Sequence, residues 1–237
     1  MCPRAGGAPG RLAPVNAVND RTAVDGRKAD LRREVRAGRR TRGDDERLRR
    51  DRLIHHHLAD RLARGVVPGA GPLPSRRTPP TVAAFCPLPG EPGGHDLPEV
   101  LRGLGARVVL PRVRAAGTPL EWYTYTGPEA LTRGAYGIRE PLATTPVDVS
   151  SEVDVVLVPA LAVGADGARL GQGGGYYDRT LADRDGRGTV WAVVDHEEFL
   201  TDVPATPLDL RVDGVVTDRG VTTFAGRRHR GRAPHHH

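Results

Sequence analysis

Short apolar runs alternate with helix-like stretches over residues 81–217, and this alternation constrains the fold more than any other feature. The clearest run is Val153–Val158, which Pro159 is expected to end. A strand of a parallel sheet covered on both faces is apolar almost throughout. We therefore predict an α/β protein with three layers, in which a mainly parallel sheet is flanked by helices. The other predicted strands are 81–86, 107–110 (ended by Pro111), 120–125, 189–194 and 212–217, and the predicted helices are 97–104 and 176–182.

The first part of the chain has a helical pattern over residues 27–64. Leu31 and Val35 are four residues apart, as are Ile54 and Leu58, with charged residues between them. This spacing places each pair on one helix face. Gly43, followed by two aspartates, predicts a break into two helices. We predict a disordered leader over 1–25, a single domain over 26–220 that begins with this helical segment, and a disordered basic tail over 221–237.

The charge of the chain is unevenly distributed. Residues 1–77 contain 19 of the 35 basic residues and 9 of the 29 acidic ones. An arginine-rich helix with a solvated face explains this excess; nucleic acid contact or binding of a small anion are the alternatives. No run approaches the roughly 20 apolar residues of a membrane span, and no signal peptide is recognisable. Cys2 and Cys86 are not expected to form a disulfide. We expect a cytoplasmic monomer that binds neither membrane nor nucleic acid.

A glycine-rich loop at residues 169–179 follows the predicted strand 153–158 and reads Arg-Leu-Gly-Gln-Gly-Gly-Gly-Tyr-Tyr-Asp-Arg. Such glycines let backbone N–H groups converge on one anion, which indicates a phosphate site, although a plain flexible loop is the alternative. Ligands of parallel sheets bind at the carboxyl ends of the strands, where this loop lies. Asp178 is suited to holding Mg²⁺ against bound phosphates, and Arg169 and Arg179 add positive charge.

Lys28 is the single lysine among the 35 basic residues. A lysine is a compact point charge on a flexible stem, well suited to reach a phosphate oxygen. The alternative explanation is that a single lysine is present by chance and has no role in binding.

The loop and several other segments resemble the 5-formyltetrahydrofolate cyclo-ligase family, also called methenyltetrahydrofolate synthetases. Lys28-Ala29-Asp30-Leu31-Arg32 is similar to the family's N-terminal motif, Glu91-Pro92 to its acidic folate position, and Gly137–Pro141 to its Gly-Ile-x-Glu-Pro segment. The resemblance covers residues 27–220 and implies the Rossmann-like fold shared with NagB, ribose-phosphate isomerases and CoA transferases. The chain departs from the family at Gln172, Gly164 and Leu208.

The resemblance implies ATP- and Mg²⁺-dependent closure of 5-formyltetrahydrofolate to 5,10-methenyltetrahydrofolate, with release of ADP and phosphate. No protein nucleophile is implied; Lys28, Arg32 and Arg179 would stabilise charge. The ATP-binding residues would be Lys28, Arg32, Arg169, Gly171, Gln172, Gly173, Gly174, Gly175, Tyr176, Tyr177 and Asp178. The folate-binding residues would be Cys86, Glu91, Trp122, Tyr123, Glu140, Gly174, Gly175 and Tyr176. The Mg²⁺ ligands would be Asp178 and Asp209.

Several interpretations stay open at this point. Trp122 and Tyr123 are in a predicted strand, where aromatic residues belong to the core more often than to a binding site. Glu140 is equally suited to contacting the substrate or capping a turn. Asp195, His196 and Glu197 are interpreted as a polar loop. The rival functions are a sugar-phosphate isomerase or acyl-CoA transferase, and a non-catalytic folate- or RNA-binding paralogue.

Overall fold

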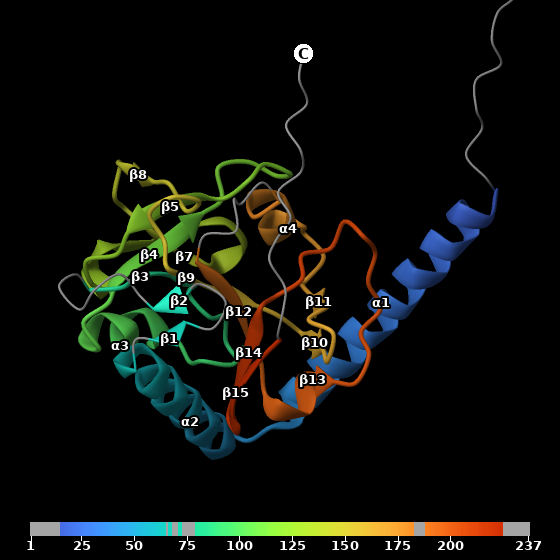
Figure 1. Cartoon of the computed structure of the whole chain (residues 1–237), viewed down its shortest axis with the longest axis horizontal. Helices are drawn as coiled ribbons and strands as arrows, with labels where there is room; N and C mark the ends of the chain where they lie inside the picture. The colour runs from blue at the N-terminus through green and yellow to red at the C-terminus, as the bar shows by residue number, and fades with distance from the viewer. Residues whose placement is uncertain (1–14, 65, 68–70, 73–78, 183–187, 225–237) are drawn as a thin grey trace, which may run out of the picture.

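The computed structural model of the 237-residue chain describes residues 15–64, 66–67, 71–72, 79–182 and 188–224 (Figure 1). The helices are α1 (Val15–Thr41), α2 (Asp44–Ala63), α3 (Leu97–Gly103) and α4 (Tyr176–Thr180), with 3₁₀ turns η1 (Pro128–Ala130), η2 (Ala135–Gly137) and η3 (His196–Glu198). The strands are β1 (Val66–Val67), β2 (Gly71–Pro72), β3 (Thr81–Ala83), β4 (Arg107–Arg112), β5 (Glu121–Thr124), β6 (Leu131–Arg133), β7 (Arg139–Pro141), β8 (Pro146–Val147), β9 (Val155–Pro159), β10 (Ala162–Gly164), β11 (Arg169–Leu170), β12 (Thr189–Val193), β13 (Phe199–Leu200), β14 (Gly214–Thr217) and β15 (Gly220–Thr223). No described helix is both long and apolar enough to span a bilayer.

The central sheet has eight strands in the order β15-β14-β12-β9-β3-β4-β5-β8. The five inner strands, from β14 to β4, are parallel to one another, and the outer strands β15, β5 and β8 pair antiparallel. The prediction of a mainly parallel sheet is therefore confirmed. The chain runs from β3 outward to β4 and then returns to the opposite side of β3 at β9. The strand order thus reverses between β3 and β9, and ligands bind at such reversals.

The apolar runs of the sequence are strands buried on both faces. In β12, Trp191 and Val193 pack with α2 and α3 on one face, whereas Val190 and Ala192 belong to the core on the other face. Successive side chains of a strand point to opposite faces, so a strand without a solvated face needs apolar residues at every position. Burial of both faces of the sheet thus explains the apolar runs seen in the sequence.

The two faces of the sheet are covered differently, which only partly agrees with the three predicted layers. Ile54 and Leu58 of α2 and Leu101 of α3 cover one face. The other face meets the short α4 and the small sheet β11-β10-β13. Helix α1 extends along this small sheet, with Leu31 and Val35 packed on its core (Figure 1). The layer on this second face therefore consists of the short helix α4 and a small sheet, and α1 packs on that small sheet.

Some predicted boundaries differ from the structure. Helix α1 begins at Val15, inside the predicted disordered leader, and β15 extends into the predicted tail. Two prolines also fail to end their strands, since β4 continues through Pro111 and β9 includes Pro159. The short strand β3 lies between β4 and β9, and its pairing ends at Val109 of β4 and at Val156 of β9. Beyond those residues β4 and β9 pair on one side only, so a proline without an N–H group can stay in the strand.

The junction of α1 and α2 is attached to the sheet by arginine–carboxylate pairs. Gly43 separates the helices, as predicted, and the segment predicted as a polar loop contains the turn η3, which includes Glu197 and has Asp195 as its N-cap. Arg42 pairs with both of these carboxylates, and Arg50 binds Glu197 at 2.8 Å. Burial and the nearby Glu198 raise the pKa of Asp195 to about 6, although the arginines oppose this shift. Hydrogen bonds from Arg50 and then Arg42 outweigh burial and lower the pKa of Glu197 to about 2.

Replacing Glu197 with glutamine should reduce the free energy of unfolding at pH 7. The pKa of Glu197 is lower in the folded protein than in the unfolded chain, so its contribution is present above about pH 4.5 and is lost as the pH falls toward 2. Because half of the side chain is exposed, we expect about 1 kcal/mol rather than the full value of the shift. Denaturant unfolding of both proteins between pH 7 and pH 3 measures this difference. If the difference in unfolding free energy between wild type and variant grew as the pH fell, the ionised Glu197 would not be the source of the stability.

Candidate functional site

A cavity of about 930 Å³ opens at the carboxyl edge of the sheet, where the strand order reverses. Phe85 and Cys86 line it just after β3, and Pro159 lines it at the end of β9. Helix α1, the glycine loop and the segment around η2 supply the remaining walls. The fold therefore brings together four of the segments that the sequence singled out, although they lie far apart along the chain.

Lys28 and Asp209 meet at the wall formed by α1. The lysine is 7% exposed, and its Nζ lies 2.6 Å and 2.8 Å from the two carboxylate oxygens. Thr206, which the sequence did not single out, donates from its hydroxyl to the same carboxylate. Burial opposes ionisation of Asp209, but the hydrogen bonds from Lys28 and Thr206 outweigh it, so the pKa lies below its usual range. Asp209 is thus held as an anion beside the only lysine of the chain.

Arg169 and Asp178, at the two ends of the glycine loop, form a second pair. Arg169 is 5% exposed, and its Nη2 lies 3.0 Å and 3.1 Å from the two oxygens of Asp178. The amide of Leu210 also donates to Asp178, at 2.8 Å. Asp178 is therefore bonded to the residue that follows Asp209, so the two predicted Mg²⁺ ligands lie close together.

These two carboxylates fit one kind of metal site. The described residues hold no cluster of three or more His, Cys, Asp or Glu side chains that could bind a metal alone. Mg²⁺ is commonly bound by one or two carboxylates together with substrate phosphates and water. Asp178 and Asp209 match this donor set, and each already has a buried cation beside it, Arg169 and Lys28 respectively.

Arginines hold the carbonyl groups of the glycine loop. Arg32 donates to Gly171 at 2.9 Å, and the exposed Arg179 donates to Gly174 at 2.6 Å. Within the described chain, the amides of Gly173, Gly174 and Gly175 have no hydrogen-bond partner. Gly173 and Gly175 adopt φ angles of 109° and 64°, which favour glycine. The loop therefore has its carbonyl oxygens neutralised and its N–H groups available, as an anion site requires.

Helix α4 after the loop is shorter than the predicted helix 176–182. It comprises Tyr176–Thr180, since Leu181 already leaves the helical conformation. A single turn has only a small dipole. The loop amides and the surrounding cations, rather than this helix, are the features that suit a phosphate.

The predicted folate residues Cys86, Glu91, Glu140 and Tyr176 line the cavity. Burial raises the pKa of the Cys86 thiol to about 11, so the thiol stays protonated and is no nucleophile. Glu140 is 7% exposed and accepts a hydrogen bond from the amide of Val113, the residue after β4, so this bond joins two strands and caps no turn. Glu140 also lines the cavity, as the substrate-binding interpretation requires.

Tyr136 lines the cavity and was missed from the sequence. Its hydroxyl lies 2.9 Å from that of Tyr176, and the two rings meet edge to face. The residue has a φ of 57°, which a non-glycine residue rarely adopts. Tyr136 lies between Gly134 and Gly137, and these two nearby glycines were the only feature of the sequence that indicated an unusual backbone conformation here.

Trp122 and Tyr123 are not among the described residues that line the cavity. Trp122 is 2% exposed and packs edge to face on Tyr177, within the core beneath the cavity. Tyr123 is covered by Arg112, whose guanidinium lies 4.1 Å from the ring centre. Both residues therefore have the core role that their strand position favoured. Tyr177 itself reaches both the core and the cavity.

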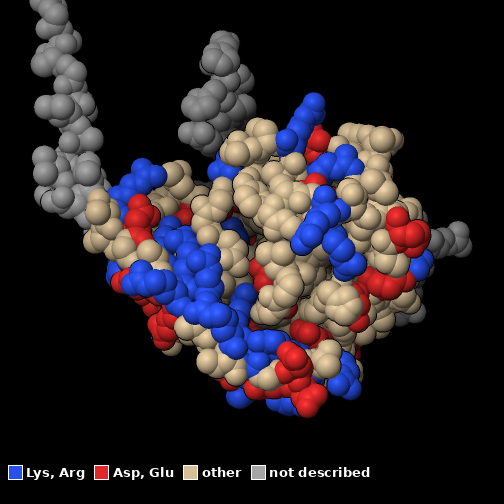
Figure 2. All heavy atoms as spheres, turned by 180° about the vertical axis from the view of Figure 1, so that it is seen from behind, with Lys and Arg blue, Asp and Glu red and all other residues tan. Residues whose placement is uncertain are grey.

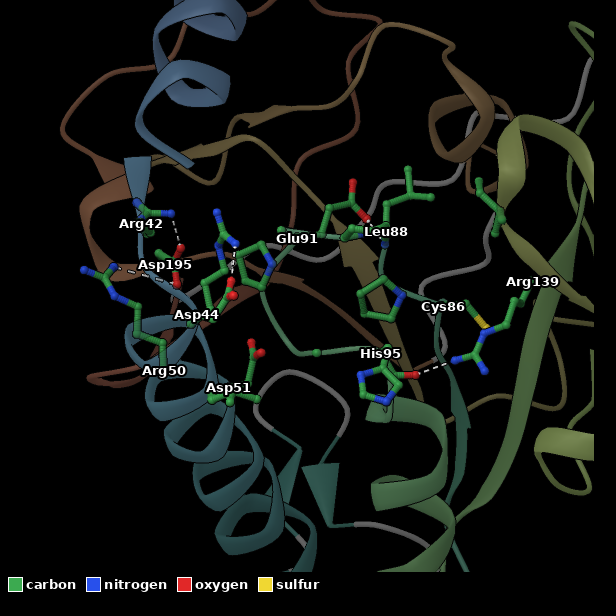
Figure 3. Close-up of a pocket in the computed structure, with 18 of the residues that line it drawn as sticks. Arg42, Asp44, Arg50, Asp51, Cys86, Leu88, Glu91, His95, Arg139 and Asp195 are labelled. Atoms are coloured by element: carbon green, nitrogen blue, oxygen red, sulfur yellow. Dashed lines mark hydrogen bonds and ion pairs between the residues drawn. The ribbon is translucent and has the colours of Figure 1, made fainter. Parts of the chain in front are cut away.

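A second pocket, of about 580 Å³, adjoins the cavity across a wall formed by Cys86, Leu88, Glu91 and Ile138. Figure 3 shows it between α2, with Arg50 and Asp51, and the side of the fold that carries Arg139. Most of its charged groups are paired with each other or with the backbone; Arg139, for example, donates to the carbonyl of His95. This pocket lacks the glycine loop and both predicted metal ligands, so it is not the phosphate site.

Basic side chains gather on the face formed by α1, as the uneven charge of the sequence suggested. Figure 2 shows them as a band. Several are already engaged with the fold: Arg32 and Arg36 bind the glycine loop, and Arg39 binds Glu198. The excess of arginine in this helix thus has structural uses besides solvation.

Comparisons with known proteins agree on one family. The model of the 5-formyltetrahydrofolate cyclo-ligase family matches residues 24–218. A 5-formyltetrahydrofolate cyclo-ligase of Mycolicibacterium smegmatis is 45% identical over 150 residues, which are 61% of this chain and 77% of that protein. A 5-formyltetrahydrofolate cyclo-ligase of Escherichia coli is 34% identical over 141 residues, which are 58% of this chain and 77% of that protein.

Solved structures give the same picture. The 5,10-methenyltetrahydrofolate synthetase of Aquifex aeolicus superposes with a TM-score of 0.65 at 30% identity, covering 89% of this chain and 99% of that one. The 5,10-methenyltetrahydrofolate synthetase of Mycoplasma pneumoniae has a TM-score of 0.61 at 22% identity, covering 81% and 98%, and supports the fold alone.

Proposed function

The chain belongs to the 5-formyltetrahydrofolate cyclo-ligase family, and on that premise we propose that it closes 5-formyltetrahydrofolate to 5,10-methenyltetrahydrofolate at the expense of ATP. One observation carries this proposal. Lys28, paired with Asp209, and the glycine loop line the same cavity as Glu91 and Glu140. The cavity thus offers a place for phosphates beside polar groups suited to a pterin ring.

The proposed reaction has two steps. The formyl oxygen attacks the γ-phosphorus of ATP, the bond to the bridging oxygen breaks, and ADP leaves. N10 of the folate then attacks the activated carbon and loses its proton, and the C–O bond breaks to release phosphate. Neither step requires a protein nucleophile, which agrees with the protonated thiol of Cys86. The protein has to orient two ligands and stabilise negative charge.

The residues of the cavity divide these tasks. The loop amides and Lys28 would bind the phosphates, with Arg32 and Arg179 holding the loop in shape through its carbonyl groups. Glu91, Glu140 and Tyr176 would orient the folate, and Tyr136 would cover it. Asp178 and Asp209 would hold Mg²⁺, which neutralises charge on the phosphates.

The decisive experiment follows the absorbance of methenyltetrahydrofolate during incubation with 5-formyltetrahydrofolate. Product should form only when both ATP and Mg²⁺ are added, with one ADP released per product. Product without ATP, or no product under any condition, would refute the proposed function.

Replacing Lys28 with arginine should raise the KM for ATP about tenfold and lower kcat less. Arginine keeps the charge, but its guanidinium is larger than the ammonium and would displace Asp209 from the buried contact in which Nζ lies within 3 Å of both carboxylate oxygens. Initial rates at varied ATP measure the effect. Arg27→Lys, at an exposed position of the same helix, is the control and should behave as wild type. An unchanged KM for ATP in Lys28→Arg would place Lys28 outside the nucleotide site.

A further inference from the structure

We infer that Gln172 positions Glu91 for the folate and thereby links the nucleotide loop to the folate site. This inference rests on the proposed function and adds a role that the resemblance does not supply, since Gln172 is one of the positions at which the chain departs from the family pattern. Gln172 belongs to the glycine loop, whereas Glu91 belongs to the segment after β3.

Gln172 makes hydrogen bonds in two directions. Its Oε1 accepts from Nη2 and Nε of Arg36 at 2.6 Å and 3.2 Å, and its Nε2 donates to Oε1 of Glu91 at 3.0 Å. The partners also define the orientation of the amide. Its oxygen faces a guanidinium, which only donates, and its nitrogen faces a carboxylate, which only accepts.

The bond from Gln172 completes the orientation of Glu91. The second carboxylate oxygen, Oε2, accepts from the amide of Leu88 at 3.0 Å. Figure 3 shows Glu91 and Leu88 side by side in the wall between the two pockets. With one bond to each oxygen, the carboxylate has a defined rotation, and its remaining lone pairs are available to a ligand. A carboxylate with a defined direction binds a pterin with less loss of conformational entropy.

The same contact couples the two binding sites. Arg36 also donates to the backbone carbonyl of Gln172, at 3.3 Å. A change in the loop when phosphates bind to its amides would therefore move the side chain that holds Glu91. Such a contact gives the coupling a physical route, and coupling between two ligands is reciprocal. ATP should tighten folate binding, and folate should tighten ATP binding by the same factor.

Two substitutions of Gln172 separate this role from a general effect on the loop. Gln172→Leu removes both hydrogen bonds at similar size. Gln172→Glu keeps an acceptor for Arg36, but it replaces the donor to Glu91 with a second carboxylate. If Gln172 acts through Glu91, both variants should raise the KM for 5-formyltetrahydrofolate about tenfold, whereas the affinity for ATP measured in the absence of folate should change less than about twofold. Arg33→Met, on the exposed face of α1, is the control.

The connection between Gln172 and Glu91 is tested by introducing Gln172→Glu into a protein that already carries Glu91→Gln. In that background, Gln172→Glu should cause no further rise in the folate KM, because the two carboxylates no longer face each other. Equilibrium binding of 5-formyltetrahydrofolate, with and without a non-hydrolysable ATP analogue, should show coupling in the wild type that both Gln172 variants lose. If the Leu variant fails to fold, the Glu variant carries the test.

The outcomes separate this inference from the proposed function. A rise in the KM for ATP with an unchanged folate KM would overturn the link to Glu91 and leave the proposed function intact. Equal effects of Gln172→Glu in both backgrounds would overturn it as well. Absence of turnover in the wild type would refute the proposed function, and the equilibrium binding measurements would then still decide whether Gln172 acts on Glu91.

Discussion

Asp178→Asn should reduce turnover about 100-fold while leaving the fold intact. Asparagine has the same shape and can still accept the hydrogen bond from the amide of Leu210. It removes the charge that pairs with the buried Arg169, at 3.0 Å, and that is proposed to hold Mg²⁺. Loss of a group that orients a metal ligand typically costs about 10- to 100-fold, so loss of the proposed ligand itself should reach the upper end of that range. Turnover measured against Mg²⁺ concentration should show both a lower maximum and a higher Mg²⁺ requirement.

A matched carboxylate controls for the loss of charge alone. Asp60 pairs with Arg64 at 2.8 Å on the surface of α2, outside the cavity. Asp60→Asn should keep the wild-type rate and Mg²⁺ dependence. A rate for Asp178→Asn close to that of wild type at low Mg²⁺ would show that Asp178 is not a metal ligand.

Arg39→Met should be the most destabilising of these substitutions. Arg39 binds Glu198 through two hydrogen bonds of 2.8 Å and 2.7 Å, and it also donates to the carbonyl of Ala160. The side chains of the pair are 7% and 4% exposed. Methionine would leave a buried carboxylate with less compensation, which typically costs about 3–5 kcal/mol. We expect a decrease in Tm of about 10 °C in thermal unfolding followed by circular dichroism.

The double variant Arg39→Met with Glu198→Gln tests the cause. It removes the buried charge that the single substitution leaves behind, so it should recover a large part of the lost stability. Arg40→Met, at the exposed neighbouring position of α1, should change Tm little. An equal loss in Arg40→Met and Arg39→Met would show that α1 as a whole, rather than the pair with Glu198, is responsible.

The candidate site was predicted from the sequence to different extents. Lys28, Arg32, Asp178 and the glycine loop were predicted because they belong to contiguous motifs whose chemistry is local. Trp122 and Tyr123 were named as folate residues, but the structure places them in the core. Their orientation depends on which face of β5 packs on Tyr177. Tyr136 and Thr206 were missed because only the folded chain brings them to the cavity.

The sequence by itself determined the mainly parallel sheet, the two N-terminal helices that part at Gly43, and a glycine-rich loop whose backbone adopts positive φ angles. Each of these follows from local periodicity, from turn residues or from backbone freedom. The tertiary structure alone decided how the charges pair. Lys28 meets Asp209 across 181 positions of the chain, and Gln172 reaches Glu91 across 81. Such pairs depend on the strand order, which reverses between β3 and β9 and gathers distant loops at one edge of the sheet.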